Sequence, residues 1–475
     1  MKKRIYLTTT LPYINAPPHI GFALEIVQAD AFARFKRLSG HQVFFNFGTD
    51  EHGQKILKAA EKEGLSPQTY ADKLAPKFDN LKKALNLSYD NFIRTTDEHH
   101  IKAARHIWKL ADKNGDIYKK KYRGLYCLSC ERFVKEGEIK EDGCPNHPGR
   151  ALEEVQEENY FFRFGKYQDF LLEYLNDPKT ITPKWRREEA INFVKEGLED
   201  FPISRLKSRM TWGVPVPEDD EHVMYVWFDA LVNYISALGW PGDEKGNFKK
   251  FWEDGETIQF AGKDQVRFQS LMWQAMLKSV GVKNTDKVFY HGFINLQGKK
   301  ISKSMGNVVD PFNLVKEFGA DALRYYLLRH VSPVEDSNFS EELLREAYNA
   351  NLANGLGNLS ARVLTLAQNN LKEAVEVVQG LHDKDYTEAF ENFDFNKAVN
   401  IVWKNIQDLD KTIAELEPYK IVKENPEGGR EIIRGLVTGL LEIANRLEPV
   451  MPETSKSIKD AIKKNKRPKN LFPRK

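Results

Sequence analysis

Three cysteines and one histidine are spaced as the ligands of a metal ion. Two residues separate Cys127 from Cys130, and two separate Cys144 from His147, with thirteen residues between the pairs. Thiolates and an imidazole at this spacing typically bind zinc, and four such ligands leave no position for a reacting water. The pattern therefore predicts one structural Zn2+ per chain. The alternative is a set of reduced, buried cysteines beside an incidental histidine.

A second group of residues could bind phosphate. The sequence Pro17-Pro18-His19-Ile20-Gly21 lies between an expected strand and an expected helix. In an open α/β sheet nucleotides bind at this edge, where His19 could donate to a phosphate and Gly21 leaves room for a purine. Taken alone, the histidine could equally belong to an ordinary turn.

A third group is a loop rich in lysine. The segment 298–307, GKKISKSMGN, has glycines at both ends and follows an expected strand. Lysines on such a hinged loop could close over a triphosphate and stabilise the charge that develops on it. We therefore regard Lys300 and Lys303 as candidates for this role. The alternative is a solvated basic loop.

Alternating strands and helices are expected to position these groups. A strand at 4–10 and a helix at 21–38 precede HQVFFNFGTD, an apolar run typical of a strand buried on both faces, which ends at Asp50. The alternation breaks from about 116 to 220 and then resumes. The pattern predicts an α/β fold with a Rossmann-like, doubly wound parallel sheet that is interrupted by an insertion.

The C-terminal third is expected to be an α-helical bundle. Beyond residue 340 the sequence is nearly all helical in pattern, and one helix has an apolar face formed by Ile433, Leu436, Val437, Leu440, Leu441, Ala444 and Leu447. Five segments are expected. They are the first half of the α/β domain (1–115), the insertion with the candidate zinc ligands (116–222), the second half of the α/β domain (223–297), the lysine loop with the region that follows it (298–340) and the helical domain (341–475).

Composition points to a cytoplasmic, multidomain protein. The chain has 475 residues, 41% hydrophobic and 29% charged, and lacks an apolar run of the roughly 18 residues that a membrane span needs. The N-terminus lacks the apolar core of a secretion signal, and an odd number of cysteines argues against a disulfide framework. The basic segment 456–475 could meet phosphates or could be a solvated tail.

The histidine motif and the lysine loop, in this order around an insertion, resemble the HIGH and KMSKS signatures of class I aminoacyl-tRNA synthetases. The resemblance to the methionyl-tRNA synthetase family covers nearly the whole chain, through TLPYINAPPHIG, FGTDEHGQKI, YCLSCERF, SRMTWGVPVP, YVWFDALVNY, GKKISKSMGNVVDP and ADALRYYLL. It implies a methionine–tRNA ligase, which activates L-methionine with ATP and Mg2+ to methionyl adenylate and pyrophosphate. The methionyl group then passes to the 3′ end of methionine tRNA.

The resemblance also implies roles for individual residues. His19, Lys300 and Lys303 are expected to act electrostatically on the phosphates, and Asp50 to hold the substrate ammonium. The implied ATP-binding residues are His19, Gly21, Lys300, Ser302, Lys303 and Ser304, and the implied methionine-binding residues are Thr10, Leu11, Tyr13, Asp50, Trp227, Ala230, Tyr234, Gln265 and Gln269. Asn358, Arg362 and Tyr419 are implied to recognise the anticodon, and the zinc knuckle to approach the acceptor end of the tRNA.

Four positions depart from the family pattern. Phe22 replaces the second histidine of the first signature, Gln265 replaces an aliphatic residue, Gln269 replaces a histidine near the methionine side chain, and Tyr419 replaces a tryptophan. Buried polar atoms of the two glutamines would need hydrogen-bond partners. A tyrosine can still stack on a splayed base.

Two alternatives remain at this level. One is a class I synthetase for isoleucine, valine, leucine or cysteine. The enzymes for isoleucine, valine and leucine resemble one another in having a large editing domain, and an insertion of about 105 residues is too short for it. The other is a tRNA-binding protein that has lost catalysis. ATP–pyrophosphate exchange measured with all twenty amino acids would distinguish these alternatives.

The chain ends at NLFPRK, where many relatives continue into a dimerising domain, so we expect a monomer.

Overall fold

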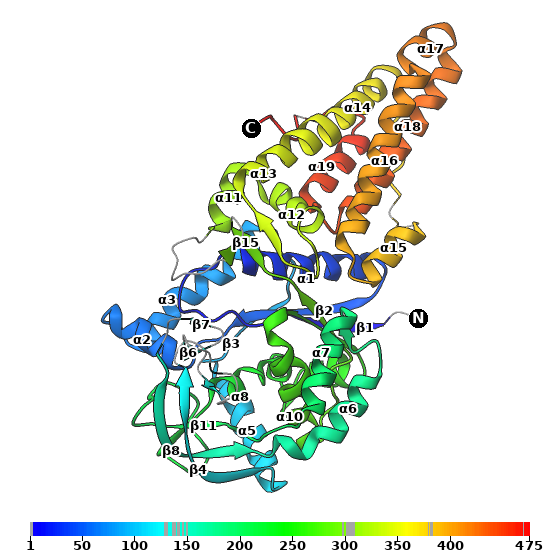
Figure 1. The fold of residues 1–475 in the computed structure, drawn as a ribbon. Coiled ribbons are helices and arrows are strands. Elements are labelled where there is room, and N and C mark those ends of the chain that lie inside the picture. Colours follow the sequence, from blue (N-terminus) through cyan, green and yellow to red (C-terminus); the bar gives the residue numbers. More distant parts are fainter. Residues whose placement is uncertain are drawn as a thin grey trace.

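A parallel sheet lies at the centre of the molecule, with the insertion on one side and the C-terminal helices on the other (Figure 1). The computed structural model describes residues 3–127, 132–134, 139, 143–144, 147–148, 151–296, 299–300, 309–378, 380, 383–468 and 470–475, without the side chains of 132, 133, 147, 148, 299 and 300. Among these residues, no helix has both the length and the apolar character required to cross a bilayer.

The central sheet has six strands in the order β3-β2-β1-β13-β14-β9, all paired in parallel. These strands are β1 (Arg4–Thr8), β2 (Gln42–Thr49), β3 (Asn91–Arg94), β9 (Ile181–Thr182), β13 (Glu256–Gly262) and β14 (Lys287–His291). The order reverses between β1 and β13, and ligands of open α/β sheets bind beside the carboxyl ends of strands at such a point. The doubly wound parallel sheet predicted from the sequence is confirmed.

Helix α1 (Ile20–Leu38) is buried on nearly all sides because it lies between the sheet and the C-terminal helices (Figure 1). Further helices follow the first strands: α2 (Gln54–Lys62), α3 (Pro67–Asp79), α4 (Leu81–Ala84) and α5 (Glu98–Lys113). The ends of α1 agree with the helix predicted at 21–38 to within one residue.

The insertion contains an antiparallel sheet of four strands in the order β10-β8-β4-β5. Its strands are β4 (Ile117–Cys127), β5 (Arg132–Val134), β8 (Glu153–Phe162) and β10 (Phe201–Pro202), and a hairpin of β6 (Gly143–Cys144) and β7 (His147–Pro148) accompanies them. Exposed and buried residues alternate along β8, as expected for a sheet with one solvated face.

Part of the segment 116–222 belongs to the central sheet rather than to the insertion. Strand β9 pairs with β14, and it lies between η2 (Phe164–Tyr167) with α6 (Gln168–Asn176) and α7 (Lys184–Lys195). A strand of two residues has no sequence periodicity, so the pattern could not separate it from the insertion. The polypeptide therefore returns to the central sheet once before leaving the insertion.

The second half of the α/β region contains several short elements. They are β11 (Ser204–Leu206), β12 (His222–Met224), α8 (Val226–Ala230), α9 (Asn233–Ser236), η3 (Phe248–Glu253), η4 (Lys263–Gln265), η5 (Phe268–Met272) and α10 (Trp273–Ser279). A three-stranded sheet of β15 (Ile294–Leu296), β16 (Lys299–Lys300) and β17 (Ser337–Phe339) follows, with α11 (Pro311–Phe318) and α12 (Ala320–Arg329).

The C-terminal region is helical, as predicted. Its elements are α13 (Glu341–Ala347), η7 (Tyr348–Gly357), α14 (Asn358–Asn370), α15 (Lys384–Glu391), α16 (Phe395–Leu416), α17 (Pro418–Glu424), α18 (Pro426–Leu447) and α19 (Pro452–Lys463). Every residue of the apolar face predicted for α18 is buried. Figure 1 shows α14, α16 and α18 extending away from the sheet to α17.

A buried ion pair connects this helical region to α1. Asp30 of α1 lies 2.8 Å from Arg324 of α12, and both side chains have no exposed surface. Arg324 also donates to the carbonyl oxygens of Val450, Pro449 and Leu85. Burial opposes ionisation of Asp30, but Arg324 and Arg34 lower the pKa of this carboxyl below its ordinary value. The helix that begins at the candidate nucleotide site is thus fixed to the C-terminal region.

Candidate active site

His19 caps the amino terminus of α1 with its imidazole. The Nδ1 atom accepts a hydrogen bond of 3.1 Å from the backbone N–H of Gly21. An imidazole that accepts through Nδ1 has its proton on Nε2 when it is neutral. The second ring nitrogen is therefore a donor, at a helix terminus whose partial positive charge favours anions.

The residues that follow His19 support its ring. A Cβ atom on Gly21 would lie 2.9 Å from Cε1 of His19, so a larger residue would push the imidazole out of position. Phe22 stacks on the same imidazole with ring centroids 4.2 Å apart and contacts Phe78 edge-on. The departure at Phe22 therefore replaces a possible donor with a packing surface for His19.

A buried carboxylate joins the loop after β1 to the end of β14. Glu25 of α1 accepts from the backbone and hydroxyl of Thr10 at 2.7 and 2.6 Å, and from Nε2 of His291 at 2.8 Å. Burial would lower the pKa of His291, but Glu25 and the carbonyl of Gly292 raise it above its ordinary value. Glu25 and His291 were not predicted from the sequence, because their contact spans 266 positions.

Asp50 lies directly beyond β2, where both of its peptide groups are held by the loop after β1. Its N–H donates to the carbonyl of Pro12 at 3.0 Å, and its carbonyl accepts from the N–H of Ile14 at 3.2 Å. Tyr13, between these two residues, donates its hydroxyl to the carbonyl of His52 at 2.6 Å. Two predicted residues, Tyr13 and Asp50, are therefore brought together, with Thr10 and Leu11 in the same loop.

The predicted aromatic and polar pocket residues come from α8, α9 and η5. Trp227 stacks on Phe268 with centroids 3.8 Å apart, and Ala230 follows on the same helix. Tyr234 donates its hydroxyl to Oε1 of buried Gln269 at 3.1 Å. Burial, with smaller contributions from Glu25 and Asp50, raises the pKa of Tyr234, so its hydroxyl keeps its proton.

The two glutamines that depart from the family pattern, Gln265 and Gln269, differ in their burial. Gln269 is buried, and within the described chain its amide Nε2 has no hydrogen-bond partner. Gln265 is half-buried at the end of η4. Phe268, which supports Trp227, was missed because a phenylalanine beside a helix carries no distinguishing sequence signal.

A second buried carboxylate ties α8 to the loop after β2. Asp229 has no exposed surface and lies 2.6 Å from Nδ1 of His52 and 2.9 Å from Nε2 of His100. Burial opposes its ionisation, but the two imidazoles hold the pKa of Asp229 at about 2. His100 also contacts Ser236 of α9. The helix that carries Trp227 and Ala230 is therefore fixed relative to Asp50.

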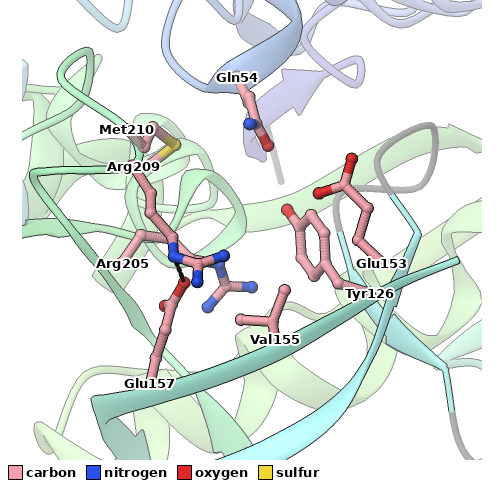
Figure 2. A pocket seen from close by; sticks show the side chains of 8 residues that line it. All are labelled: Gln54, Tyr126, Glu153, Val155, Glu157, Arg205, Arg209 and Met210. Carbon is pink, nitrogen blue, oxygen red and sulfur yellow. Dashed lines mark ion pairs between the residues drawn. The ribbon is translucent and has the colours of Figure 1, made fainter.

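A polar pocket lies between α2 and the insertion (Figure 2). It is lined by Gln54, Tyr126, Glu153, Val155, Glu157, Arg205, Arg209 and Met210. Glu157 pairs with Arg209 at 3.0 Å on one wall, and Tyr126 and Glu153 lie opposite in Figure 2. Because Gln54 follows Asp50 by four positions, the insertion faces the chain just beyond the candidate substrate site.

Several predicted residues fall wholly or partly outside the described part of the chain. Cys130, Ser302, Lys303 and Ser304 lie outside the described residues, as do the side chains of His147 and Lys300. The other two cysteines, Cys127 and Cys144, are buried in one small cluster with Val134. Among described residues, no group of three or more potential ligands forms a metal site.

The three predicted anticodon residues are exposed on the helical region. Asn358 and Arg362 lie one turn apart on α14, and Arg362 pairs with Asp410 of α16 at 2.5 Å. Tyr419 on α17 is 46% exposed and donates to Glu417 at 2.7 Å. The three residues therefore lie on the surface of the helical region, on α14 and α17.

Comparison with known proteins places these features in one family. The model of tRNA synthetases class I (M) matches residues 5–364. The methionine–tRNA ligase of Caldanaerobacter subterraneus is 42% identical over 96% of this chain and 74% of its own length, and that of Rhizobium meliloti is 41% identical over 96% and 91%. The solved Mycobacterium tuberculosis methionyl-tRNA synthetase in complex with methionyl-adenylate aligns with a TM-score of 0.89, 36% identity, and coverage of 97% of this chain and 94% of that one. On this agreement of sequence and fold, the chain belongs to the methionine–tRNA ligase family of class I tRNA synthetases.

Proposed function

We propose that the carboxyl ends of β1, β2 and β13 bind ATP and L-methionine and join them as methionyl adenylate, with release of pyrophosphate. The adenylate then passes its methionyl group to the 3′ end of methionine tRNA. The observation that carries this proposal is that His19 follows β1 and Asp50 follows β2 at the carboxyl edge of the sheet. Asp229, on the helix of Trp227, is bonded to His52, two residues beyond Asp50. The solved relative in complex with methionyl-adenylate supports it.

On the nucleotide side, this chain contributes donors and space. The Nε2–H of His19 donates to a phosphate oxygen, and Gly21 lets the purine approach the backbone. Lys300 and Lys303, with the hydroxyls of Ser302 and Ser304, close over the phosphates and stabilise charge as pyrophosphate separates. Mg2+ bound with ATP neutralises part of the phosphate charge.

On the methionine side, Asp50 accepts from the substrate ammonium, and the backbone at Thr10 and Leu11 forms the floor of the pocket. Tyr13 and Trp227 surround the side chain, because a polarisable thioether packs favourably against aromatic faces. Ala230, Tyr234, Gln265 and Gln269 complete the pocket. The reaction needs no nucleophile from the protein, so positioning and electrostatics supply the rate enhancement.

ATP–pyrophosphate exchange tests this assignment directly. The wild-type chain should exchange with methionine and with no other amino acid at comparable rate. Lys303→Ala should lower kcat for exchange by about 10²- to 10³-fold with little change in KM for ATP, because it removes an interaction made mainly in the transition state. Exchange with a different amino acid, or none at all, would overturn the proposed activity.

We also propose that Cys127, Cys130, Cys144 and His147 hold one structural Zn2+. Cys127 and Cys144 share a small buried cluster, and Cys144 lies opposite His147 in the β6–β7 hairpin, which suits a shared ligand set. Elemental analysis should find about one zinc per chain, and Cys144→Ser should lose it. A folded protein purified without metal would contradict this proposal.

The remaining assignments concern tRNA and cellular setting. Asn358, Arg362 and Tyr419 recognise the anticodon, and their common exposure on α14 and α17 supports this role.

We propose a monomeric enzyme in the cytoplasm, where the tRNA and reduced cysteines are found. Light scattering of the purified chain at micromolar concentration should give 54.8 kDa, and twice that mass would contradict the proposed monomer.

A further inference from the structure

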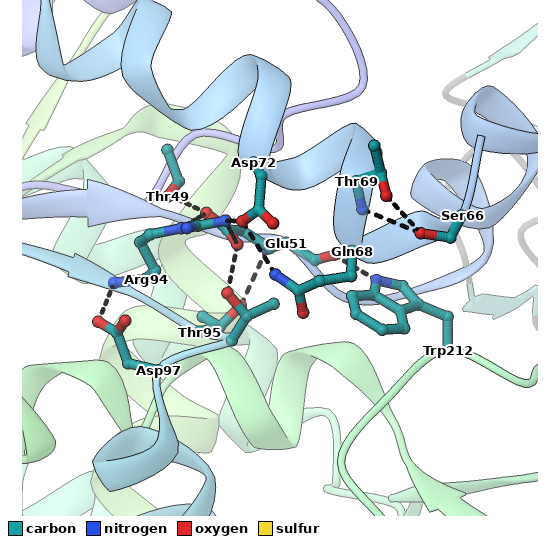
Figure 3. Close-up of polar contacts among 11 residues, drawn as sticks. Thr49, Glu51, Ser66, Gln68, Thr69, Asp72, Arg94, Thr95, Asp97 and Trp212 are labelled. Atoms are coloured by element: carbon teal, nitrogen blue, oxygen red, sulfur yellow. Dashed lines mark hydrogen bonds and ion pairs between the residues drawn. The ribbon is translucent and has the colours of Figure 1, made fainter. Parts of the chain in front are cut away.

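Glu51, the residue after Asp50, is a fully buried carboxylate with every oxygen engaged (Figure 3). Its Oε1 accepts from the hydroxyl of Thr49 at 2.6 Å and from Nε of Arg94 at 2.8 Å. Its Oε2 accepts from Nη2 of Arg94 at 2.9 Å and from the hydroxyl of Thr96 at 2.6 Å. Arg94 therefore binds the carboxylate with two parallel bonds, the strongest geometry for this pair.

The backbone of Glu51 is fixed as firmly as its side chain. Its N–H donates to the hydroxyl of Thr95 at 2.9 Å, and its carbonyl accepts from the indole N–H of Trp212 at 2.6 Å. The next residues are also held, because the N–H of Gly53 donates to the carbonyl of Trp212. Asp50 is thus attached to a neighbour that has almost no conformational freedom.

These contacts exclude a direct role for Glu51 in binding substrate. Each carboxylate oxygen already accepts two hydrogen bonds, and the side chain has no exposed surface. Burying an ion pair rarely stabilises a fold more than apolar packing of the same volume does. The pair of Glu51 and Arg94 therefore contributes defined geometry at this position more than net stability.

We propose that Glu51 and Arg94 are positioning residues that fix the carboxylate of Asp50 where the ammonium of methionine binds. Neither residue touches the substrate. The pair connects the carboxyl end of β2 to that of β3, where Thr49 and Arg94 are paired in register, so Asp50 cannot shift relative to the sheet. The inference rests on the proposed function, in which Asp50 accepts from the ammonium.

The network also reaches the protein surface, where it provides a matched control. Nη2 of Arg94 donates to Asp72 of α3 at 2.7 Å, and Asp72 accepts from Gln68. The Asp72 side chain is 52% exposed, so this outer contact is screened by water. Asp72→Asn removes the negative charge that Arg94 meets at the surface and leaves the two bonds from Arg94 to Glu51 in place, so methionine binding should not change.

The test compares methionine with 4-methylsulfanylbutanoate, which has the same side chain and carboxylate but no ammonium. In pyrophosphate exchange, Glu51→Gln should raise KM for methionine by about 10- to 100-fold, because displacement by an ångström is costly at a preorganised site. The inhibition constant of the amine-free analogue should change less than about twofold. Equal weakening of both compounds indicates a general structural defect and would overturn the proposal.

Combination with Asp50→Asn separates this inference from the proposed function. If Glu51 acts through Asp50, adding Glu51→Gln to Asp50→Asn should cause no further rise in KM, whereas independent roles would add. Additive losses would overturn the inference but leave the role of Asp50 intact. If Asp50→Asn alone leaves KM for methionine unchanged, the proposed role of Asp50 is wrong, and the inference falls with it.

Milder variants keep the proposal testable if Glu51→Gln does not fold. Thr96→Val removes one hydroxyl from Glu51 without leaving a buried charge unpaired, and should raise KM for methionine several-fold. Arg94→Lys keeps the charge but cannot reproduce the paired bonds, and should have a larger effect than Thr96→Val. No change in the ratio of methionine to analogue binding in either variant would refute the positioning role.

Discussion

Polar residues are buried at the carboxyl ends of the central strands but exposed on the distal helices of the C-terminal region. At the carboxyl ends of the strands, Asp229 is fully buried and bonded to two imidazoles. On the distal helices, Arg362 and Asp410 form an ion pair whose side chains are 46% and 51% exposed. The first arrangement fixes geometry before the substrate arrives, whereas the second leaves side chains free to exchange partners.

The contrast follows from the ligands proposed for each end. A small amino acid must be held so that its carboxylate meets the phosphate of ATP, and such alignment requires rigid neighbours. An anticodon is recognised through bases that leave their stack, and exposed side chains can adapt to them at little cost. The same type of substitution should therefore affect stability and activity differently at the two ends.

The largest effect is expected from Asp229→Asn. The variant keeps the shape of the side chain but leaves His52 and His100 with only one good acceptor in a buried site, so unfolding should become easier by about 3 kcal/mol. Urea denaturation measures this change. Asp410→Asn, on the exposed face, is the control and should shift stability by less than about 0.5 kcal/mol. Equal changes in the free energy of unfolding of the two variants would contradict the difference proposed between the buried and the exposed polar residues.

On the exposed helical region, Arg362→Ala should affect aminoacylation of tRNA but not formation of the adenylate. Aminoacylation of methionine tRNA should fall by about 10- to 100-fold, because the substitution removes every hydrogen bond that the guanidinium would make to an anticodon base. The rate of pyrophosphate exchange should change less than about twofold, since adenylate forms in the α/β region. The free energy of unfolding should hardly change. Lys404→Ala, which breaks an exposed pair on α16 with Asp408, is the control. A parallel loss of exchange would contradict this separation.

Gln269→Leu should have a moderate effect confined to methionine binding. The variant removes the acceptor to which the buried hydroxyl of Tyr234 donates, so KM for methionine should rise about 3- to 10-fold. The KM for ATP should stay constant, and exchange assays with each substrate varied in turn measure both. A rise in the KM for ATP instead would place Gln269 outside the methionine pocket.

The smallest effect concerns the pH dependence of stability. Because the folded protein raises the pKa of His291, the stabilisation from its bond to Glu25 is complete below about pH 6.5, the ordinary value. It is lost as the pH rises through the raised pKa. Relative to His291→Gln, the wild-type chain should lose about 1 kcal/mol between pH 6 and pH 9. Identical slopes in urea denaturation across this range would contradict the assignment.

Local patterns predicted much of the fold, whereas long-range contacts were out of their reach. Hydrophobic patterns predicted α1 to within one residue and the buried face of α18, and the first signature placed His19 at the start of α1. The contacts of Asp229 span 177 and 129 positions, and no short window contains both partners. Resemblance to a family supplied Trp227, but only the structure gives its support by Phe268.

The buried pair of Asp30 and Arg324 limits how the gene can be divided. A fragment that ends before residue 449 would leave the guanidinium of Arg324 without the carbonyl oxygens of Pro449 and Val450, to which it donates in the whole chain. Catalytic and helical regions should therefore melt together in a single calorimetric transition rather than as separate domains. Engineers who want a minimal adenylate-forming enzyme would have to redesign this contact first, and a split version of the chain should regain activity only when both fragments are present.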